Sequence, residues 1–237
     1  MIPKTIHLIW LGKSSWRIRK QINNIAKSCP DCEIRVWTLS NFDTSKFEYT
    51  CQAMQQKQYA FVSDYIRLWV LYNFGGTYLD LDVNIIQPIN RDFFENDNFV
   101  VGFEKNDIIG SAVISAVKGS QVVKEMLDYM DSLVKINPET IGKIANVTWM
   151  SQIIHNHGIL LDGKEHVNSY GIHVLGLEAY GFPNACSTVV HIMSASWVSR
   201  RPLSQKIGSI LRKQVTSKKR AVLYHRVRSL IWKRQGE

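Results

Sequence analysis

Long hydrophobic runs are absent from this sequence. No apolar stretch approaches the roughly 20 residues that a membrane-spanning helix needs, and residues 1–10 are too short for a secretion signal and lack its cleavage region. Cysteine is also scarce, because four residues in 237 are too few for a disulfide scaffold. Cys29 and Cys32 have the spacing of a redox or zinc pair, but no second pair stands at zinc-ligand distance. We therefore expect a cytoplasmic protein whose cysteines are ordinary reduced thiols.

Acidic residues are nearly missing from the C-terminal end. Residues 199–237 hold 12 Lys or Arg and one acid, Glu237, whereas residues 1–198 hold 17 basic and 19 acidic side chains. Apolar residues recur in the basic segment at three- and four-residue steps, which predicts two basic amphipathic helices. The change in composition divides the chain into a body, residues 1–198, and a helical extension, residues 199–237.

Three roles fit the extension. Our hypothesis is attachment to an anionic membrane surface, the inner leaflet, because basic amphipathic helices bind such surfaces. The alternatives are two solvated helices packed on the body, and a nucleic-acid-binding segment, since the same charges would bind phosphates. We expect the membrane as partner and no nucleic acid.

Strands and helices alternate along the body. Residues 4–10 and 33–38 have the apolar, β-branched character of buried strands, and the spacing between them predicts a helix over residues 16–28. The other expected elements are helices over residues 55–74, 122–134 and 149–157 and strands over residues 77–86, 99–103 and 112–116. This alternation predicts an α/β fold whose parallel or mixed sheet is covered by helices.

The predicted helix over residues 55–74 carries a buried ion pair. From Tyr59 to Phe74 almost every side of the helix is apolar, and its only charges are Asp64 and Arg67, with Ser63 on the same arc. The desolvation of two charges can exceed the attraction between them, so the pair is poor evidence for stability and fair evidence for a site. A salt bridge that holds the helix to the sheet explains it equally well.

The next predicted strand carries two aspartates. Tyr78, Asp80, Asp82 and Asn84 alternate with apolar residues, so a continuous strand would put all four on one face. Carboxylates on one face repel each other unless a cation lies between them, and hard oxygen ligands suit Mn²⁺ or Mg²⁺. Alone, an Asp-x-Asp sequence is a weak signal, because a solvated strand edge has the same pattern.

Together these segments resemble the glycosyltransferases of family 32, which include bacterial capsular polysaccharide enzymes and yeast-type mannosyltransferases, and they are similar to the glucosylating domain of the large clostridial toxins. The resemblance rests on residues 59–69, 75–82 and 2–10 and on Val190, His191, Ser196 and Trp197, and it covers roughly residues 1–198. It implies a GT-A-type nucleotide-sugar-binding fold with a mixed central sheet flanked by helices, followed by the basic helical extension.

The resemblance also implies the role of each site residue. Asp82 would bind Mn²⁺ or Mg²⁺ directly, Asp80 would bind it directly or through water, and His191 would be a further ligand. Trp10 would stack on the nucleobase, and Tyr78 would pack beside the ribose. Ser63, Asp64 and Arg67 would contact the nucleotide and the donor sugar. His191, or the loop bearing Ser196 and Trp197, would reach the diphosphate from the other side. Asp80, Asp82 and Arg67 would be catalytic, because the metal that the two aspartates hold and the Arg67 guanidinium stabilise the charge on the departing diphosphate.

The implied reaction moves a hexose from a UDP- or GDP-sugar to a hydroxyl of a saccharide or lipid-linked oligosaccharide, with retention, in capsular or other surface polysaccharide synthesis. The identity of the sugar stays open, because the chain has Ile109, Gly110 and Ser111 where relatives often carry an Asn. A phosphohydrolase of the haloacid dehalogenase type would also use Asp80 and Asp82 after an apolar strand. That family needs Thr or Val where this chain has Asn84, and a later acidic pair that we do not find.

Overall fold

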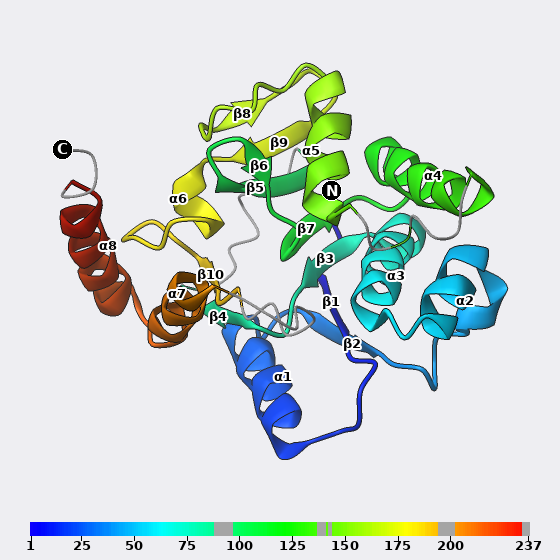
Figure 1. Cartoon of the computed structure of the whole chain (residues 1–237), viewed down its shortest axis with the longest axis horizontal. Coiled ribbons are helices and arrows are strands. Elements are labelled where there is room, and N and C mark those ends of the chain that lie inside the picture. Colours follow the sequence, from blue (N-terminus) through cyan, green and yellow to red (C-terminus); the bar gives the residue numbers. More distant parts are fainter. Residues whose placement is uncertain (88–96, 137–140, 142–143, 194–201, 234–237) are drawn as a thin grey trace.

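The computed structural model of the chain describes residues 1–87, 97–136, 141, 144–193 and 202–233. The strands are β1 (Thr5–Ile9), β2 (Glu33–Trp37), β3 (Gly76–Leu79), β4 (Val83–Ile85), β5 (Phe99–Lys105), β6 (Ile108–Ile109), β7 (Val113–Ala116), β8 (His166–Val167), β9 (Ile172–Leu175) and β10 (Val189–His191). The helices are α1 (Trp16–Ser28), the short 3-10 helix η1 (Thr44–Lys46), α2 (Glu48–Gln55), α3 (Tyr59–Phe74), α4 (Gln121–Ile136), α5 (Asn146–Asn156), α6 (Leu177–Tyr180), α7 (Leu203–Lys213) and α8 (Lys218–Lys233). Figure 1 shows their arrangement around a central sheet.

The strands form a large mixed sheet and a small antiparallel pair. In the large sheet the order is β2-β1-β3-β7-β5-β9-β8, with β6 paired to β5. β1 is parallel to β2 and β3, and β5 is parallel to β9, whereas β7 is antiparallel to both neighbours, β3 and β5. The small pair consists of β4 and β10. The expected α/β fold with a mixed central sheet is confirmed.

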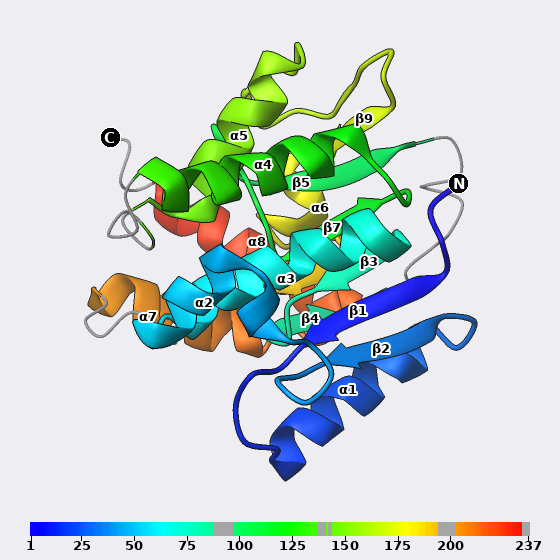
Figure 2. The same ribbon diagram turned by 90° about the vertical axis from the view of Figure 1, so that its right-hand side faces the viewer.

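Helices cover both faces of the large sheet (Figure 2). On one face, α2, α3, α4 and α5 share the main core, to which Leu71, Met126 and Ile154 contribute fully buried side chains. On the other face, Ile25 of α1 packs with Leu8 of β1 in a second core, which also includes residues of β4 and β10. The small strand pair therefore lies on the α1 side of the sheet, at the end of β3.

Two glycines connect α3 to β3 at close quarters. Gly75 has φ 67° and Gly76 has φ 104°, in the left-handed region that favours glycine. A Cβ on Gly76 would lie 2.5 Å from the carbonyl oxygen of Thr5, and a Cβ on Gly75 would lie 2.6 Å from the backbone nitrogen of Lys118. The turn thus brings the end of α3 against β1, and so fixes the ion pair of α3 relative to the aspartates after β3.

The expected continuous strand over residues 77–86 is wrong. β3 ends at Leu79, residues 81 and 82 form a turn, and β4 begins at Val83. The Asp80 N–H still donates to the carbonyl of Ala112, at 2.9 Å, but the chain then leaves the large sheet because β4 pairs with β10. Asp80 and Asp82 therefore belong to a bend between two sheets and not to one face of one strand.

The expected helix over residues 55–74 is also divided in two. α2 ends at Gln55 and α3 begins at Tyr59, and Lys57 between them has φ 57°, which no helix continues through. The expected helix over residues 149–157 begins earlier, at Asn146. The helix over residues 16–28 and the strand that begins at Glu33 are confirmed.

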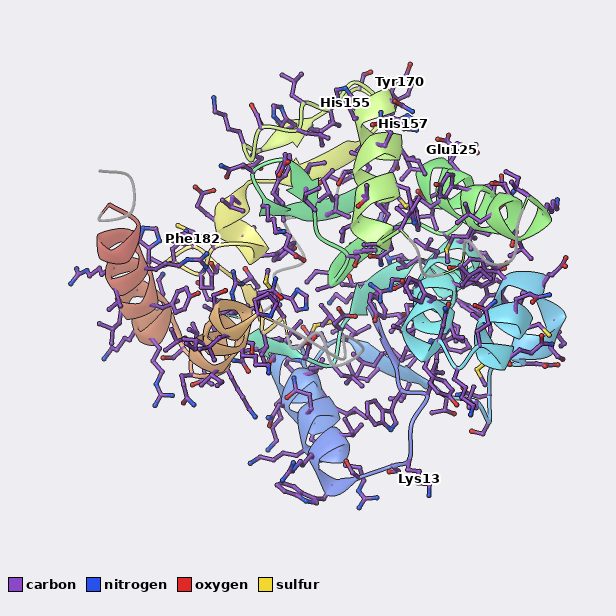
Figure 3. The ribbon with its side chains drawn as sticks, in the orientation of Figure 1. Lys13, Glu125, His155, His157, Tyr170 and Phe182 are labelled. Atoms are coloured by element: carbon purple, nitrogen blue, oxygen red, sulfur yellow. A yellow bond between two sulfur atoms is a disulfide. The ribbon has the colours of Figure 1, made fainter. Side chains whose placement is uncertain are left out.

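The C-terminal extension forms the two expected helices, and they pack on the body. Arg212 of α7 is only 5% exposed, and its guanidinium donates to the carbonyl oxygens of Gly181, at 2.7 Å, and His191, at 3.1 Å. Val215 and Ala221 form a buried cluster with Val190 of β10. On α8, the ring of His225 contacts Phe182, which is labelled in Figure 3. The expected boundary between residues 198 and 199 lies outside the described residues.

The cysteines depart from expectation. Cys29 and Cys32 form a disulfide, whereas Cys51 and Cys186 are free. The turn between α1 and β2 brings the Cα atoms of the first pair to 5.4 Å, a separation that a disulfide spans. The prediction of four reduced thiols is therefore wrong for this pair. In the part of the chain that the structure describes, no helix combines the length and apolar character that crossing a bilayer requires.

Candidate functional site

Two carboxylates and an imidazole meet where β3 and β10 end and β4 begins. Asp80 follows β3, Asp82 precedes β4, and His191 closes β10, opposite Val83 in the antiparallel pair. One potential ligand atom from each of these three side chains lies within 4.8 Å of the other two, and each residue is half-buried. Oxygen and imidazole ligands suit Mn²⁺, and two carboxylates suit Mg²⁺. The donor set therefore fits a divalent cation with further positions for a substrate.

The imidazole of His191 is surrounded by carboxylates. Its Nε2 lies 3.3 Å from Asp82 Oδ1 and 3.9 Å from Asp80 Oδ2, and its Nδ1 lies 3.5 Å from Glu104 Oε2. Burial lowers the pKa of His191, but the contacts with Asp82, Glu104 and Asp80 outweigh burial and raise it to about 10. In the absence of a cation, a proton on His191 thus neutralises part of the acidic cluster, and a bound dication would take the place of that proton.

Glu104, on β5, contacts the second ring nitrogen of His191, Nδ1. Burial raises its pKa, but its contact with His191 more than compensates and holds the pKa below its usual value. A carboxylate on the second nitrogen of a metal-binding histidine fixes the orientation of the ring and increases its basicity. Glu104 could not be recognised as a site residue from the sequence, because one acid near the end of an apolar strand carries no signal of its own.

The ion pair of α3 adjoins this cluster. Arg67 Nη2 lies 2.8 Å from Asp64 Oδ1 and 3.5 Å from Asp80 Oδ1, and Nη1 donates to the carbonyl oxygen of Ser111 at 2.8 Å. The guanidinium lies over the ring of Tyr78, with Cζ 4.5 Å from the ring centroid. Arg67 Nε is buried and has no hydrogen-bond partner in the described part of the chain. The pair is therefore an internal salt bridge that also contacts the acidic cluster through Asp80.

Burial acts on both partners of this pair. It raises the pKa of Asp64 to about 6, assisted by Asp80 and opposed by Arg67. For Arg67 burial lowers the pKa, but Tyr78 and the acids around it raise it above its usual value, so Arg67 stays charged. The Tyr78 hydroxyl donates to Asp80 Oδ1, and Ser63 hydrogen bonds to the same hydroxyl. A permanent cation thus stands beside a carboxylate that can change protonation near neutral pH.

Asn146 completes the surroundings of Asp64. It is the first residue of α5, and its Nδ2 donates to Asp64 Oδ1 at 2.9 Å and to Ser111 Oγ at 3.1 Å. Asn146 could not be recognised as a site residue from the sequence, because it is distant in sequence from Asp64 and Ser111 and because Asn is common at helix starts.

The structure thus brings together most of the predicted site residues. These are Ser63, Asp64, Arg67, Tyr78, Asp80, Asp82 and His191, and their roles toward a ligand stay predictions. Trp10, half-buried after β1, donates through Nε1 to the carbonyl oxygen of Lys13 at 2.9 Å, and its stacking role is a prediction. Ser196 and Trp197 lie outside the described residues.

Comparison with known proteins points to the same region. Residues 15–100 match the model of a protein family described as a glycosyltransferase sugar-binding region containing a DXD motif, and Asp80-Leu81-Asp82 is an Asp-x-Asp sequence within that range. No curated protein sequence matches the chain.

Two solved structures are similar to the chain. One is the PaToxG Glycosyltransferase, with 18% identity and a TM-score of 0.52 over 66% of this chain and 70% of that chain. The other is a glycosyltransferase involved in the glycosylation of the major capsid of PBCV-1, with 12% identity and a TM-score of 0.45 over 89% of this chain and 98% of that chain.

The first of these likenesses is one of fold. It confirms the expected GT-A-like arrangement of a mixed sheet flanked by helices, and together with the sequence match it supports a glycosyltransferase. The chain is thus similar to glycosyltransferases in fold, and its residues 15–100 match their DXD-containing sugar-binding region.

Proposed function

We propose that the protein is a metal-dependent glycosyltransferase that moves a hexose from a UDP- or GDP-sugar to a hydroxyl of a saccharide or lipid-linked oligosaccharide. One observation carries the proposal. The ligand atoms of Asp80, Asp82 and His191 lie within 4.8 Å of one another, directly beside the buried pair of Asp64 and Arg67. A cation in this cluster and the guanidinium of Arg67 would offer two neighbouring positive charges to a diphosphate.

The departure of the diphosphate is the step that these charges would assist. When bound, Mn²⁺ or Mg²⁺ supplies electrostatic stabilisation of the negative charge that grows on the leaving group. Arg67 would add to it, because Asp64 and the carbonyl of Ser111 hold the guanidinium in one orientation before substrate arrives. Its buried Nε, which has no partner among the described residues, is a donor that a ligand could satisfy.

The donor hexose would lie against Asp64, Ser111 and Asn146. The Asn146 amide donates to both the Asp64 carboxylate and the Ser111 hydroxyl, and these three groups can accept from and donate to the hydroxyls of a sugar. Trp10, Ser63, Tyr78, Ser196 and Trp197 would bind the nucleotide and diphosphate. Retention and a role in capsular or other surface polysaccharide synthesis complete the proposal and rest on resemblance. The proposed site of action, in the cytoplasm at the inner face of a bacterial plasma membrane, is supported by the basic amphipathic helices of the extension.

The rival phosphohydrolase would need one aspartate as a nucleophile. Asp80 accepts a hydrogen bond from Tyr78 and lies 3.5 Å from Arg67, and His191 stands at 3.9 Å from its other oxygen. A carboxylate engaged on both oxygens suits a ligand or structural anion better than an attacking group. These contacts favour the glycosyltransferase.

Hydrolysis of nucleotide sugars without an acceptor tests the proposal. The purified chain, incubated with a panel of UDP- and GDP-hexoses, should release nucleotide with Mn²⁺ or Mg²⁺ and not with EDTA. Asp82→Asn should lower the rate about 100-fold or more, because it removes a charged ligand of the cation. The matched control is Asp162→Asn, whose carboxylate pairs with His166 instead, at 2.7 Å, and which should keep wild-type activity. Absence of metal-dependent turnover and of binding to every donor in calorimetry would refute the proposal.

A further inference from the structure

The apolar stripe of α7 faces solvent and not the body. Leu203, Ile207, Ile210 and Leu211 follow one another at helical spacing along one side of the helix. Their exposed fractions are 73%, 49%, 61% and 48%. Helices that pack on a globular body turn such a stripe toward the core. The stripe of α7 is therefore turned the opposite way.

The side of α7 that meets the body is polar. Arg212 is the buried residue of this helix, and it is held by the carbonyl oxygens of Gly181 and His191. From the body, Asn84 Nδ2 donates to the carbonyl oxygens of Val215, at 3.0 Å, and Lys213, at 3.2 Å. Hydrogen bonds thus fix α7 in place, and its apolar stripe does not contribute to this attachment.

α8 also exposes apolar side chains. Leu223 and Val227, one turn apart, are 62% and 48% exposed. Lys218, Lys219 and Arg226 are exposed on the same helix. No Asp or Glu occurs between residues 199 and 236. Both helices therefore expose apolar and basic side chains, and no described Asp or Glu on these helices neutralises the basic ones.

We propose that this outer face, made of the exposed apolar and basic residues of α7 and α8, docks on an anionic lipid bilayer. The apolar side chains would enter the boundary between headgroups and acyl chains, and the lysines and arginines would contact headgroup phosphates. A nucleic acid would satisfy the basic residues but leave the stripe in water. In this arrangement α7 and α8 would lie along the bilayer surface.

Hydrogen bonds connect α7 to the cluster formed by Asp80, Asp82 and His191. Arg212 donates to the carbonyl of His191, and Asn84 of β4 binds the end of α7, so α7 is attached to both strands of the small pair that carries His191 (Figure 1). A bilayer under α7 would hold the cluster at a set distance from the membrane surface, where a lipid-linked acceptor is presented. This last step alone rests on the proposed function, and the docking itself does not.

Sedimentation with vesicles tests the proposal on the full chain. The wild type should pellet with vesicles of phosphatidylcholine and phosphatidylglycerol, and much less with phosphatidylcholine alone. The triple variant Leu203→Ser, Ile207→Ser, Ile210→Ser should bind at least about tenfold more weakly, since it removes apolar area that enters the bilayer. The matched control, Leu39→Ser, Leu160→Ser, Val167→Ser, changes exposed apolar residues elsewhere and should bind like the wild type.

A second pair of variants tests the charges. Lys218→Gln with Lys219→Gln should weaken binding to anionic vesicles by about fivefold per charge, whereas Lys20→Gln with Lys27→Gln on α1 should have no such effect. Nucleotide-sugar hydrolysis in solution should be the same in all these variants, so loss of docking and failure of the proposed function are distinguishable.

Three results would overturn the docking proposal. The first is equal pelleting of the stripe variant and the wild type, and the second is equal binding to neutral and anionic vesicles. The third is no binding of the wild type to anionic vesicles. Retention on RNA that depends on Lys218 and Lys219 would then identify a nucleic acid as the partner, and a dimer in solution that the stripe variant dissociates would identify a second copy of the chain.

Discussion

Replacing Asp64 by Asn should change how the stability of the protein depends on pH. Burial raises the pKa of Asp64 to about 6 in the folded chain, from an ordinary value of 3.8. A carboxyl whose pKa is raised by folding holds its proton more tightly in the native state. Its contribution to stability is therefore complete below pH 3.8 and is lost as the pH rises through 6.

The size of the effect follows from the gap of about two pKa units. At about 1.4 kcal/mol per unit, the wild type should lose about 3 kcal/mol of unfolding free energy through Asp64 alone, most of it between pH 4 and pH 6. Asn at this position can still accept from Asn146, but it has no proton to release. The stability of Asp64→Asn relative to the wild type should therefore rise with pH by this amount, whatever constant cost arises from the lost partner of Arg67.

Urea unfolding followed by tryptophan fluorescence, at several pH values in the presence of EDTA, measures this difference. The control is Asp162→Asn, because its hydrogen bond with His166 lowers the pKa of Asp162. The sign is then reversed, since the contribution of Asp162 is present above its ordinary pKa and is lost as the pH falls. If the unfolding free energies of the wild type and Asp64→Asn changed with pH in parallel, burial would not disfavour the ionised Asp64 carboxylate, and the reasoning would be refuted.

Two further substitutions test Glu104 and Gly76. Glu104→Gln should weaken Mn²⁺ binding in calorimetry by about 10- to 100-fold, since the oriented carboxylate behind His191 is lost. Glu125→Gln, which breaks the 2.8 Å contact with His157 in another part of the molecule (Figure 3), should leave it unchanged, and equal affinity in both variants would contradict a positioning role for Glu104. Gly76→Ala should lower the unfolding free energy by about 1–3 kcal/mol, because φ is 104° and the new Cβ would meet Thr5. Gly119→Ala, where φ is 75° but no atom lies within 4 Å, should cost less, and equal losses would contradict the steric argument.

The local elements of this fold were predictable because they depend on local pattern. The helix over residues 16–28 and the burial of Asp64 and Arg67 follow from apolar spacing, which the structure confirms. The prediction of a continuous strand over residues 77–86 was wrong because it also depended on local pattern alone. Tyr78, Asp80, Asp82 and Asn84 alternate as one strand would, and only the pairing of β4 with β10, far along the chain, shows that the backbone bends.

The other features that could not be predicted from the sequence depend on contacts between residues that are distant in the chain. Glu104 and Asn146 reach the site from β5 and α5, and each has a polar partner that is distant in sequence. The periodicity of residues 203–215 predicted an amphipathic α7 correctly, but not which side would face the body. Buried hydrogen bonds of Arg212 decide that orientation, and a hydrophobic pattern contains no information about them.

The pairing of β4 with β10 also sets what a fragment of this protein can do. Asp82 and His191 are more than a hundred residues apart in sequence and become neighbours only when β4 and β10 form their antiparallel pair. A proteolytic piece ending before residue 189 would retain both aspartates and the whole matched region, yet it would lack the third ligand and the strand that secures the bend. Fragment complementation, with a peptide that contains β10 and α7 restoring cation binding to the larger piece, would therefore report on closure of the entire fold.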